Sequence, residues 1–269
     1  MNARMYRLIC ALPCGVLAVT CHPVRAADYT WDGTGNNWNT AHWLPGPVAG
    51  PTAAGNTATI NSGTVSFSIN DTFGIHSTAS TPTVNLNSGG MLASGGFFTT
   101  IIGLNLNGGT LLANGGVNNP FGAFALKGTV TVGGSSASAI SLGSGSFNTL
   151  SIGNASAGGT TTFDVADVTA GGAADLTVAV PLNNIANVQS GLVKTGAGTM
   201  TLTGANVYTG VTTVGGGTLD IAAGGSLTGA GNVNTTGGGI LTISGAVTLA
   251  GGRVFSTGNG FRGPPARWS

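Results

Sequence analysis

Few side chains in this chain could take part in acid–base catalysis, and the chemistry they would serve is glycan cleavage. All seven acidic residues are aspartates, namely Asp28, Asp32, Asp71, Asp164, Asp167, Asp175 and Asp220. Glycosidases use two positioned carboxylates, and Asp164 and Asp167 are the closest interior pair. Three residues apart on one strand, they would point to opposite faces unless a turn brought them together. This spacing does not favour a glycosidase site.

Basic residues for a polysaccharide lyase are scarce. Lys127 and Lys194 are the only lysines, and no arginine lies between Arg25 and Arg253. The two histidines of the interior, His42 and His76, are far apart and have no nearby acid cluster to complete a metal site. We therefore expect no catalytic, cofactor-binding or metal site. A β-helical polysaccharide-degrading enzyme stays as an alternative.

The composition indicates many short strands joined by tight turns. Of 269 residues, 49 are glycine and only 6% are charged, against about 25% in an ordinary soluble domain. A disordered chain would be poor in apolar residues, whereas here they make up 41% and fall in short regular runs. Such runs between glycine turns are typical of all-β proteins.

Residues 1–27 are predicted to be a cleaved signal peptide. Arg4 and Arg7 form a positive start, an apolar run covers 8–20, and Val24-Arg25-Ala26 offers small residues for cleavage. The run is shorter than the roughly 20 residues that a membrane span requires. All three cysteines lie in this leader, so the mature chain is expected to have neither a disulfide nor a thiolate metal site.

Removal of the leader leaves a slightly acidic chain. Three of the eight basic residues are lost, so five face seven aspartates for a net charge of −2. This balance gives no electrostatic basis for binding nucleic acid. No membrane span is expected in the mature chain.

Residues 28–56 contain three of the four tryptophans, Trp31, Trp38 and Trp43. A solenoid needs an atypical terminal unit to cover its core, and large aromatic side chains can fill that position. The segment is predicted to be an N-terminal cap. Exposed tryptophans that stack on a sugar or a partner surface are the alternative.

Self-similarity at a spacing near twenty residues runs through the chain after residue 57. Residues 85–93 (NLNSGGMLA) resemble 105–113 (NLNGGTLLA) at an offset of twenty, and 217–219 resemble 239–241 at an offset of twenty-two. Such a period is typical of solenoids, in which each repeat buries its apolar face against its neighbours.

The predicted fold is all-β, a right-handed single-stranded parallel β-helix. Coils are expected over 57–190 and again over 223–252. An antiparallel β-sandwich is the alternative, because short alternating strands do not reveal their pairing direction. The last segment, 253–269, holds three arginines and Gly263-Pro264-Pro265. We expect it to be an irregular tail, produced by truncation or a frameshift.

The segment 191–222 carries the most specific pattern. Residues 192–219 read LVKTGAGTMTLTGANVYTGVTTVGGGTL, which resembles the autotransporter-associated β-strand repeat, also called the passenger-associated transport repeat. Met200 stands where that pattern has its first leucine. The positions that match, or fall in its core and its following strand, are Lys194, Gly196, Gly198, Leu202, Asn206, Tyr208, Gly210, Thr212, Gly217 and Leu219.

This resemblance implies structural roles for those residues: turns, a stacked polar corner and a packed aromatic ring. It also implies a bacterial exported or cell-surface protein, associated with the outer membrane, in which the repeat supports folding and secretion of a β-helical passenger. The partners implied are the export machinery and a cell-surface glycan or protein. A carbohydrate- or surface-binding adhesin is the alternative function.

Overall fold

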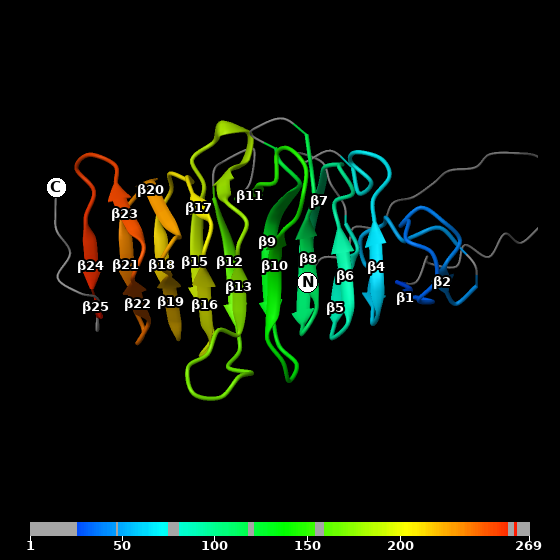
Figure 1. Cartoon of the computed structure of the whole chain (residues 1–269), viewed down its shortest axis with the longest axis horizontal. Helices are drawn as coiled ribbons and strands as arrows, with labels where there is room; N and C mark the ends of the chain where they lie inside the picture. The colour runs from blue at the N-terminus through cyan, green and yellow to red at the C-terminus, as the bar shows by residue number, and fades with distance from the viewer. Residues whose placement is uncertain are drawn as a thin grey trace, which may run out of the picture.

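The chain forms a parallel β-helix, in which strands of successive coils lie side by side along the long axis (Figure 1). The computed structural model describes residues 26–46, 48–74, 81–117, 121–153, 159–257 and 261–262. The predicted fold class is confirmed. The sandwich alternative is wrong, because among the described strands only β1 and β2 pair antiparallel, and every other ladder is parallel. The predicted signal peptide lies outside the described residues, apart from Ala26 and Ala27.

In the described residues the first sheet has eleven strands, and from β3 onward successive coils add one strand each. Its members in chain order are β1 (Asp28–Trp31), β2 (Trp43–Leu44), β3 (Thr57–Ile60), β5 (Thr83–Asn87), β7 (Thr99–Asn107), β9 (Phe124–Val132), β12 (Thr160–Val165), β15 (Gly191–Thr195), β18 (Thr212–Val214), β21 (Val233–Thr235) and β24 (Phe255–Thr257).

In the described residues the second sheet has nine strands, and from β3 onward each follows a strand of the first sheet, through the loop over residues 166–174 in the case of β13 (Leu176–Val178). Its members are β4 (Gly63–Ser66), β6 (Gly90–Ala93), β8 (Thr110–Ala113), β10 (Ser138–Leu142), β13 (Leu176–Val178), β16 (Thr199–Leu202), β19 (Thr218–Ile221), β22 (Ile240–Ile243) and β25 (Phe261–Arg262).

Two smaller sheets are formed by further strands of the later coils, from Leu150 onward. One pairs β11 (Leu150–Ile152) with β14 (Leu182–Asn184), and the other joins β17 (Ala205–Asn206), β20 (Ser226–Ala230) and β23 (Ala246–Leu249). A single turn of 3-10 helix, η1 (Ile185–Asn187), follows β14.

The register of the ladders equals the offsets seen in the sequence. Asn85 pairs with Asn105 across β5 and β7, twenty residues apart, and Leu219 pairs with Leu241 across β19 and β22, twenty-two residues apart. Like residues therefore stack on like residues. On the outer face, the amide of Asn105 donates to that of Asn85 over 2.7 Å.

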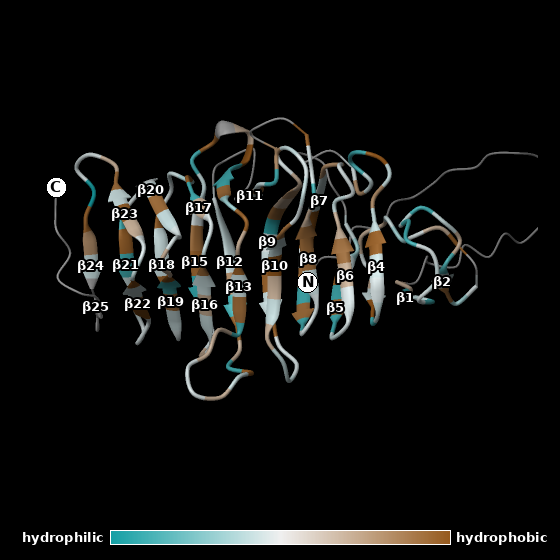
Figure 2. Ribbon diagram, in the orientation of Figure 1, coloured by the Kyte–Doolittle hydropathy of each residue, from teal (hydrophilic) through white to brown (hydrophobic). Residues whose placement is uncertain are grey.

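The core is a continuous apolar column enclosed by the sheets. Side chains alternate between the two faces of each strand, so that Val84 and Leu86 of β5 point inward and stack on Leu104 and Leu106 of β7. Figure 2 shows the resulting bands of hydrophobic and polar residues along the strands. Backbone hydrogen bonds join each coil to the next. Burial of the apolar column contributes a folding free energy of roughly 25 cal/mol per Å² of apolar surface.

The three tryptophans of the N-terminal segment are buried in this column. Trp38 and Trp43 lie 4.6 Å apart between ring centroids, and Trp38 also contacts Phe73 at 5.0 Å. The indole Nε1 of Trp43 donates to the carbonyl of Trp38 over 3.0 Å. These rings fill the core at the first coils and do not form an exposed platform for a sugar.

Two short strands, β24 and β25, lie in the described part of the segment that was expected to be an irregular tail. Phe255 of β24 pairs in parallel with Val233 of β21, and Phe261 of β25 pairs with Leu241 of β22. Two more strands thus extend the first and second sheets. The reason is that the preceding coil offers an unpaired edge, which can order a segment of low strand propensity.

Candidate functional site

The site comprises two successive coils that contain the motif: β15, β16 and β17 lie in the first, and β18 and β19 lie in the second. Three of its inward-facing positions hold polar side chains, Lys194, Asn206 and Thr212, and all three are fully buried. Polar groups in such a position are destabilising unless they are hydrogen-bonded. Each of the three side chains has hydrogen-bond partners, and those of Lys194 and Asn206 include backbone groups of a neighbouring coil.

Lys194 occupies a core position of the first sheet. It pairs with Phe163 of the coil before and with Val214 of the coil after, so its methylene stem is part of the apolar column. The ammonium reaches out of the column and donates to the carbonyls of Thr195 at 2.8 Å, Gly196 at 3.0 Å and Gly216 at 3.1 Å. The side chain thereby ties the turn of its own coil to the turn of the next.

The ammonium of Lys194 loses its proton more readily than that of an ordinary lysine. Burial lowers its pKa to about 8, while the carboxylates of Asp164 and Asp175 oppose that shift. The ammonium is therefore the main form at neutral pH, and it donates to three carbonyl groups.

Asn206 connects three successive coils. Its Oδ1 accepts a hydrogen bond from the backbone N–H of Leu182 in the preceding coil over 3.1 Å. Its Nδ2 donates to the carbonyl of Gly204 in its own coil at 3.0 Å and to that of Ser226 in the next at 2.9 Å. The amide uses three of its four hydrogen-bonding positions on backbone groups.

Tyr208 and Thr212 satisfy one another inside the core. The two hydroxyl oxygens are 2.8 Å apart, and Tyr208 is fully buried. Burial raises the pKa of Tyr208 well above its ordinary value, against the hydrogen bond to Thr212, so the phenol stays neutral. The ring packs inside the apolar column.

The glycines of the motif lie where the backbones of adjacent coils approach one another. A Cβ on Gly196, Gly198, Gly210 or Gly217 would come closer than 3.0 Å to backbone atoms of a neighbouring segment. At Gly196 the φ of +76° adds a second reason for glycine.

The two leucines of the motif are core residues. Leu202 pairs with Ile221 and is fully buried, and Leu219 pairs with Met200 and is fully buried as well. Met200 thus fills the same column as the leucine it replaces, a swap that conserves volume.

Sequence reasoning missed two polar residues that belong to the preceding coil. Asp175 is 1% exposed and accepts a hydrogen bond from the backbone N–H of Thr199 over 2.7 Å. Asn184 accepts one from the N–H of Thr209 over 3.0 Å. Both residues lie before the motif. Asp175 could have been recognised from its position between a glycine-rich loop and a strand, where an aspartate often accepts hydrogen bonds from backbone N–H groups.

The aspartate pair considered for glycan cleavage does not form a buried acid–base site. Asp164 lies on the outer face of β12 and accepts a hydrogen bond from Thr195 over 3.0 Å. Asp167 follows the end of the strand, and both side chains are exposed.

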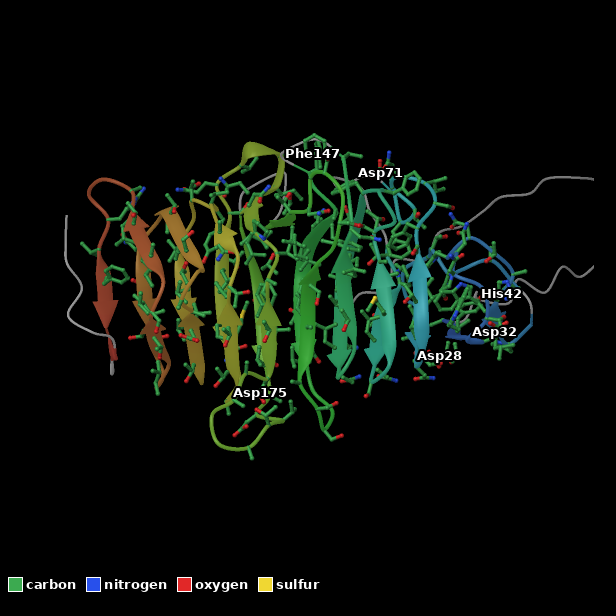
Figure 3. All side chains as sticks on the ribbon, viewed as in Figure 1. Asp28, Asp32, His42, Asp71, Phe147 and Asp175 are labelled. Atoms are coloured by element: carbon green, nitrogen blue, oxygen red, sulfur yellow. The ribbon has the colours of Figure 1, made fainter. Side chains whose placement is uncertain are left out.

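Sequence reasoning also missed an Asp–His pair, formed by Asp32 and His42 near the N-terminus (Figure 3). Nδ1 of His42 is 3.1 Å from Oδ2 of Asp32 and 3.0 Å from Oγ1 of Thr34. The backbone N–H of Thr34 is the first cause that lowers the pKa of Asp32. Because the carboxylate and the hydroxyl meet the same ring nitrogen, the trio cannot relay a proton as a catalytic triad does.

Within the residues that the structure describes, no group of three or more histidine, cysteine or acidic side chains is placed to hold a metal ion. His76 lies outside those residues. No helix in the described ranges is both long and apolar enough to cross a bilayer.

The family model described as passenger-associated-transport-repeat matches residues 192–221. No curated protein and no solved structure matches the chain. The matched range contains Lys194, Asn206 and Tyr208, so this segment of the parallel β-helix is similar to a passenger-associated-transport-repeat.

Proposed function

We propose that this chain is an exported β-helical passenger or surface structural protein, and that the repeat at 192–221 supports its folding and secretion. The observation that carries the proposal is the set of side-chain bonds between coils. Lys194 and Asn206 both donate to backbone carbonyls of the following coil. A solenoid folds by adding coils to a formed one, and these side chains stabilise that addition at one place.

The family match supports the location of the protein outside the cytoplasm, since the repeat is associated with transported passengers. The proposal includes the export machinery as a partner, and a glycan or protein of a cell surface as the contact of the extended β-helix. It assigns no catalytic role to Asp164 and Asp167. The burial of Trp31, Trp38 and Trp43 speaks against an adhesin that uses those rings.

Export of the full chain from a bacterial host tests this function. We expect Lys194→Met and Asn206→Leu to lower the yield of folded, protease-resistant protein outside the cell, and to slow refolding of the purified chain. Gly215→Ala is the control, because a Cβ there meets its neighbours at 3.7 Å or more. Export of both variants at the wild-type level, despite slower refolding, would refute the proposed role in secretion.

A further inference from the structure

Asp175 stands directly before β13, at the base of a loop that projects from the β-helix over residues 166–174 (Figures 1 and 3). It lies seventeen residues before the matched range begins, in the coil that precedes the repeat. Its side chain is almost completely buried, at 1% exposure. A buried carboxylate needs several donors, and its donors come from two different places.

One carboxylate oxygen organises the loop. Oδ1 of Asp175 accepts hydrogen bonds from the backbone N–H of Val168 at 2.8 Å and of Thr169 at 2.7 Å, and from the hydroxyl of Thr169 at 2.8 Å. These three bonds hold the loop against the start of β13.

The other oxygen faces the repeat. Oδ2 of Asp175 accepts a hydrogen bond from the backbone N–H of Thr199 over 2.7 Å. In return, the backbone N–H of Asp175 donates to the carbonyl of Thr199 over 2.9 Å. The first residue of β16 is thus held by Asp175 on both of its backbone polar groups, and the carboxylate bond is of the charge-assisted kind.

This arrangement also explains a glycine of the motif. A Cβ on Gly198 would lie 2.6 Å from Oδ2 of Asp175, so only glycine leaves room for the carboxylate at this turn. Burial raises the pKa of Asp175, but the hydrogen bonds from Thr199, Val168 and Thr169 outweigh it and hold the pKa below its ordinary value. The residue is therefore ionised at neutral pH and accepts all four bonds.

We propose that Asp175 is the positioning residue of the repeat: its carboxylate, which belongs to the preceding coil, fixes the position of the first turn of the repeat by its hydrogen bond to Thr199. The structural unit then begins at Asp175, before the matched range of residues 192–221. This inference rests on the proposed function only for its biological purpose, because the geometry concerns the folded chain alone.

Hydrogen exchange of the full chain carrying Asp175→Asn tests the proposal. An asparagine can keep its single carbonyl oxygen on the three loop donors, and its NH₂ group then faces the N–H of Thr199 without accepting a bond. We expect exchange at Thr199 to accelerate about tenfold or more, as after loss of a charge-assisted hydrogen bond. Val168 and Thr169 should keep their protection.

The matched control is Thr169→Val, which removes one donor from the loop side only. It should raise exchange in the loop and leave Thr199 unchanged. Unchanged protection of Thr199 in Asp175→Asn overturns the proposal, and so does equal loosening of both regions by both variants, which would make Asp175 a loop anchor only.

If Asp175→Asn does not fold, the wild-type chain supplies the test through acidification. Protonation of Asp175 should weaken protection at Thr199 before it affects Leu192, whose N–H bonds to the carbonyl of Val211. Simultaneous loss at both positions overturns the proposal. These readouts are local to Thr199 in the purified chain, so they can fail or succeed independently of the export yield that tests the proposed function.

Discussion

The ammonium of Lys194 donates to the carbonyl of Gly216, 3.1 Å away and twenty-two residues further along the chain. The same side chain occupies a core position between Phe163 and Val214. Lys194 is therefore both part of the apolar column and a link between the turns of two coils. A long side chain with an apolar stem and a charged end can do both.

Replacement of Lys194 by methionine keeps the apolar stem and removes the three donors. We expect Lys194→Met to destabilise the protein by about 1–3 kcal/mol, since carbonyls of Thr195, Gly196 and Gly216 lose their partner. Urea unfolding at pH 7 measures the change. Thr213→Val, at the half-buried middle residue of β18, should change stability by less than about 0.5 kcal/mol. An equal effect of both substitutions would show that the three bonds are not needed.

Alkaline pH should reveal the buried ammonium. The pKa of Lys194 in the folded chain is about 8, below the roughly 10.4 of an unfolded lysine. Between these values the unfolded chain binds the proton more tightly, so the contribution of this group to the free energy of unfolding rises as pH rises from about 8 to 10.4. Unfolding curves of the wild type and Lys194→Met across this range check the sign. A wild-type stability that falls relative to the variant over the same window contradicts it.

Two glycines of the repeat make a matched pair. A Cβ on Gly198 would come within 3.0 Å of backbone atoms of Ala166 and of the Asp175 carboxylate, whereas a Cβ on Gly215 would stay 3.7 Å or more from its neighbours. We expect Gly198→Ala to cost about 1–3 kcal/mol, as overpacking does. Gly215→Ala should be neutral, or stabilising by about 0.4–1 kcal/mol through the unfolded state. Thermal unfolding of the two variants side by side decides this, and similar melting temperatures would contradict the expected difference.

The parallel β-helix could be predicted because similar residues recur in the sequence at the spacing of one coil. The twenty-residue offset between Asn85 and Asn105 is the register of the first sheet itself, since parallel stacking places equivalent residues above one another. The motif residues could be recognised for a related reason. Glycine is required where two backbones approach closely, and leucine and tyrosine fill the apolar column.

The contacts between coils could not be predicted from local pattern. Asp175 reaches Thr199 across twenty-four residues, and His42 meets Asp32 through the fold of the N-terminal segment. Neither side chain shows in the sequence which backbone group or ring it will face. The strands β24 and β25 were not predicted. They pair with β21 and β22 of the preceding coil, and the composition of residues 253–269 does not reveal this pairing.

Removal of one hydroxyl tests the polar pair inside the core. Tyr208→Phe leaves the hydroxyl of Thr212 buried without its partner at 2.8 Å, and we expect a loss of about 1–3 kcal/mol. Thr212→Val in the same background should recover part of the loss, because both polar groups are then gone. A double-mutant cycle from urea unfolding measures the coupling, and strictly additive losses would mean that the two hydroxyls do not stabilise one another.

Acid should remove the contribution of Asp175. The folded pKa lies below the ordinary value of 3.8, since the bonds from Thr199, Val168 and Thr169 outweigh the larger single effect of burial. Stability from this carboxylate is therefore fully present above about pH 4 and is lost as pH falls through the folded pKa. We expect the difference in unfolding free energy between the wild type and Asp175→Asn to shrink steadily below pH 4.

The control for this acid effect is Asp167→Asn, which removes the same charge from an exposed position at the start of the same loop. Its unfolding free energy should follow that of the wild type within about 0.5 kcal/mol at every pH. Because the two variants have equal net charge, a general effect of charge on the acid-unfolded chain cancels between them. A wild-type advantage over Asp175→Asn that stays constant down to pH 2 would show that the carboxylate is not the group that holds Thr199.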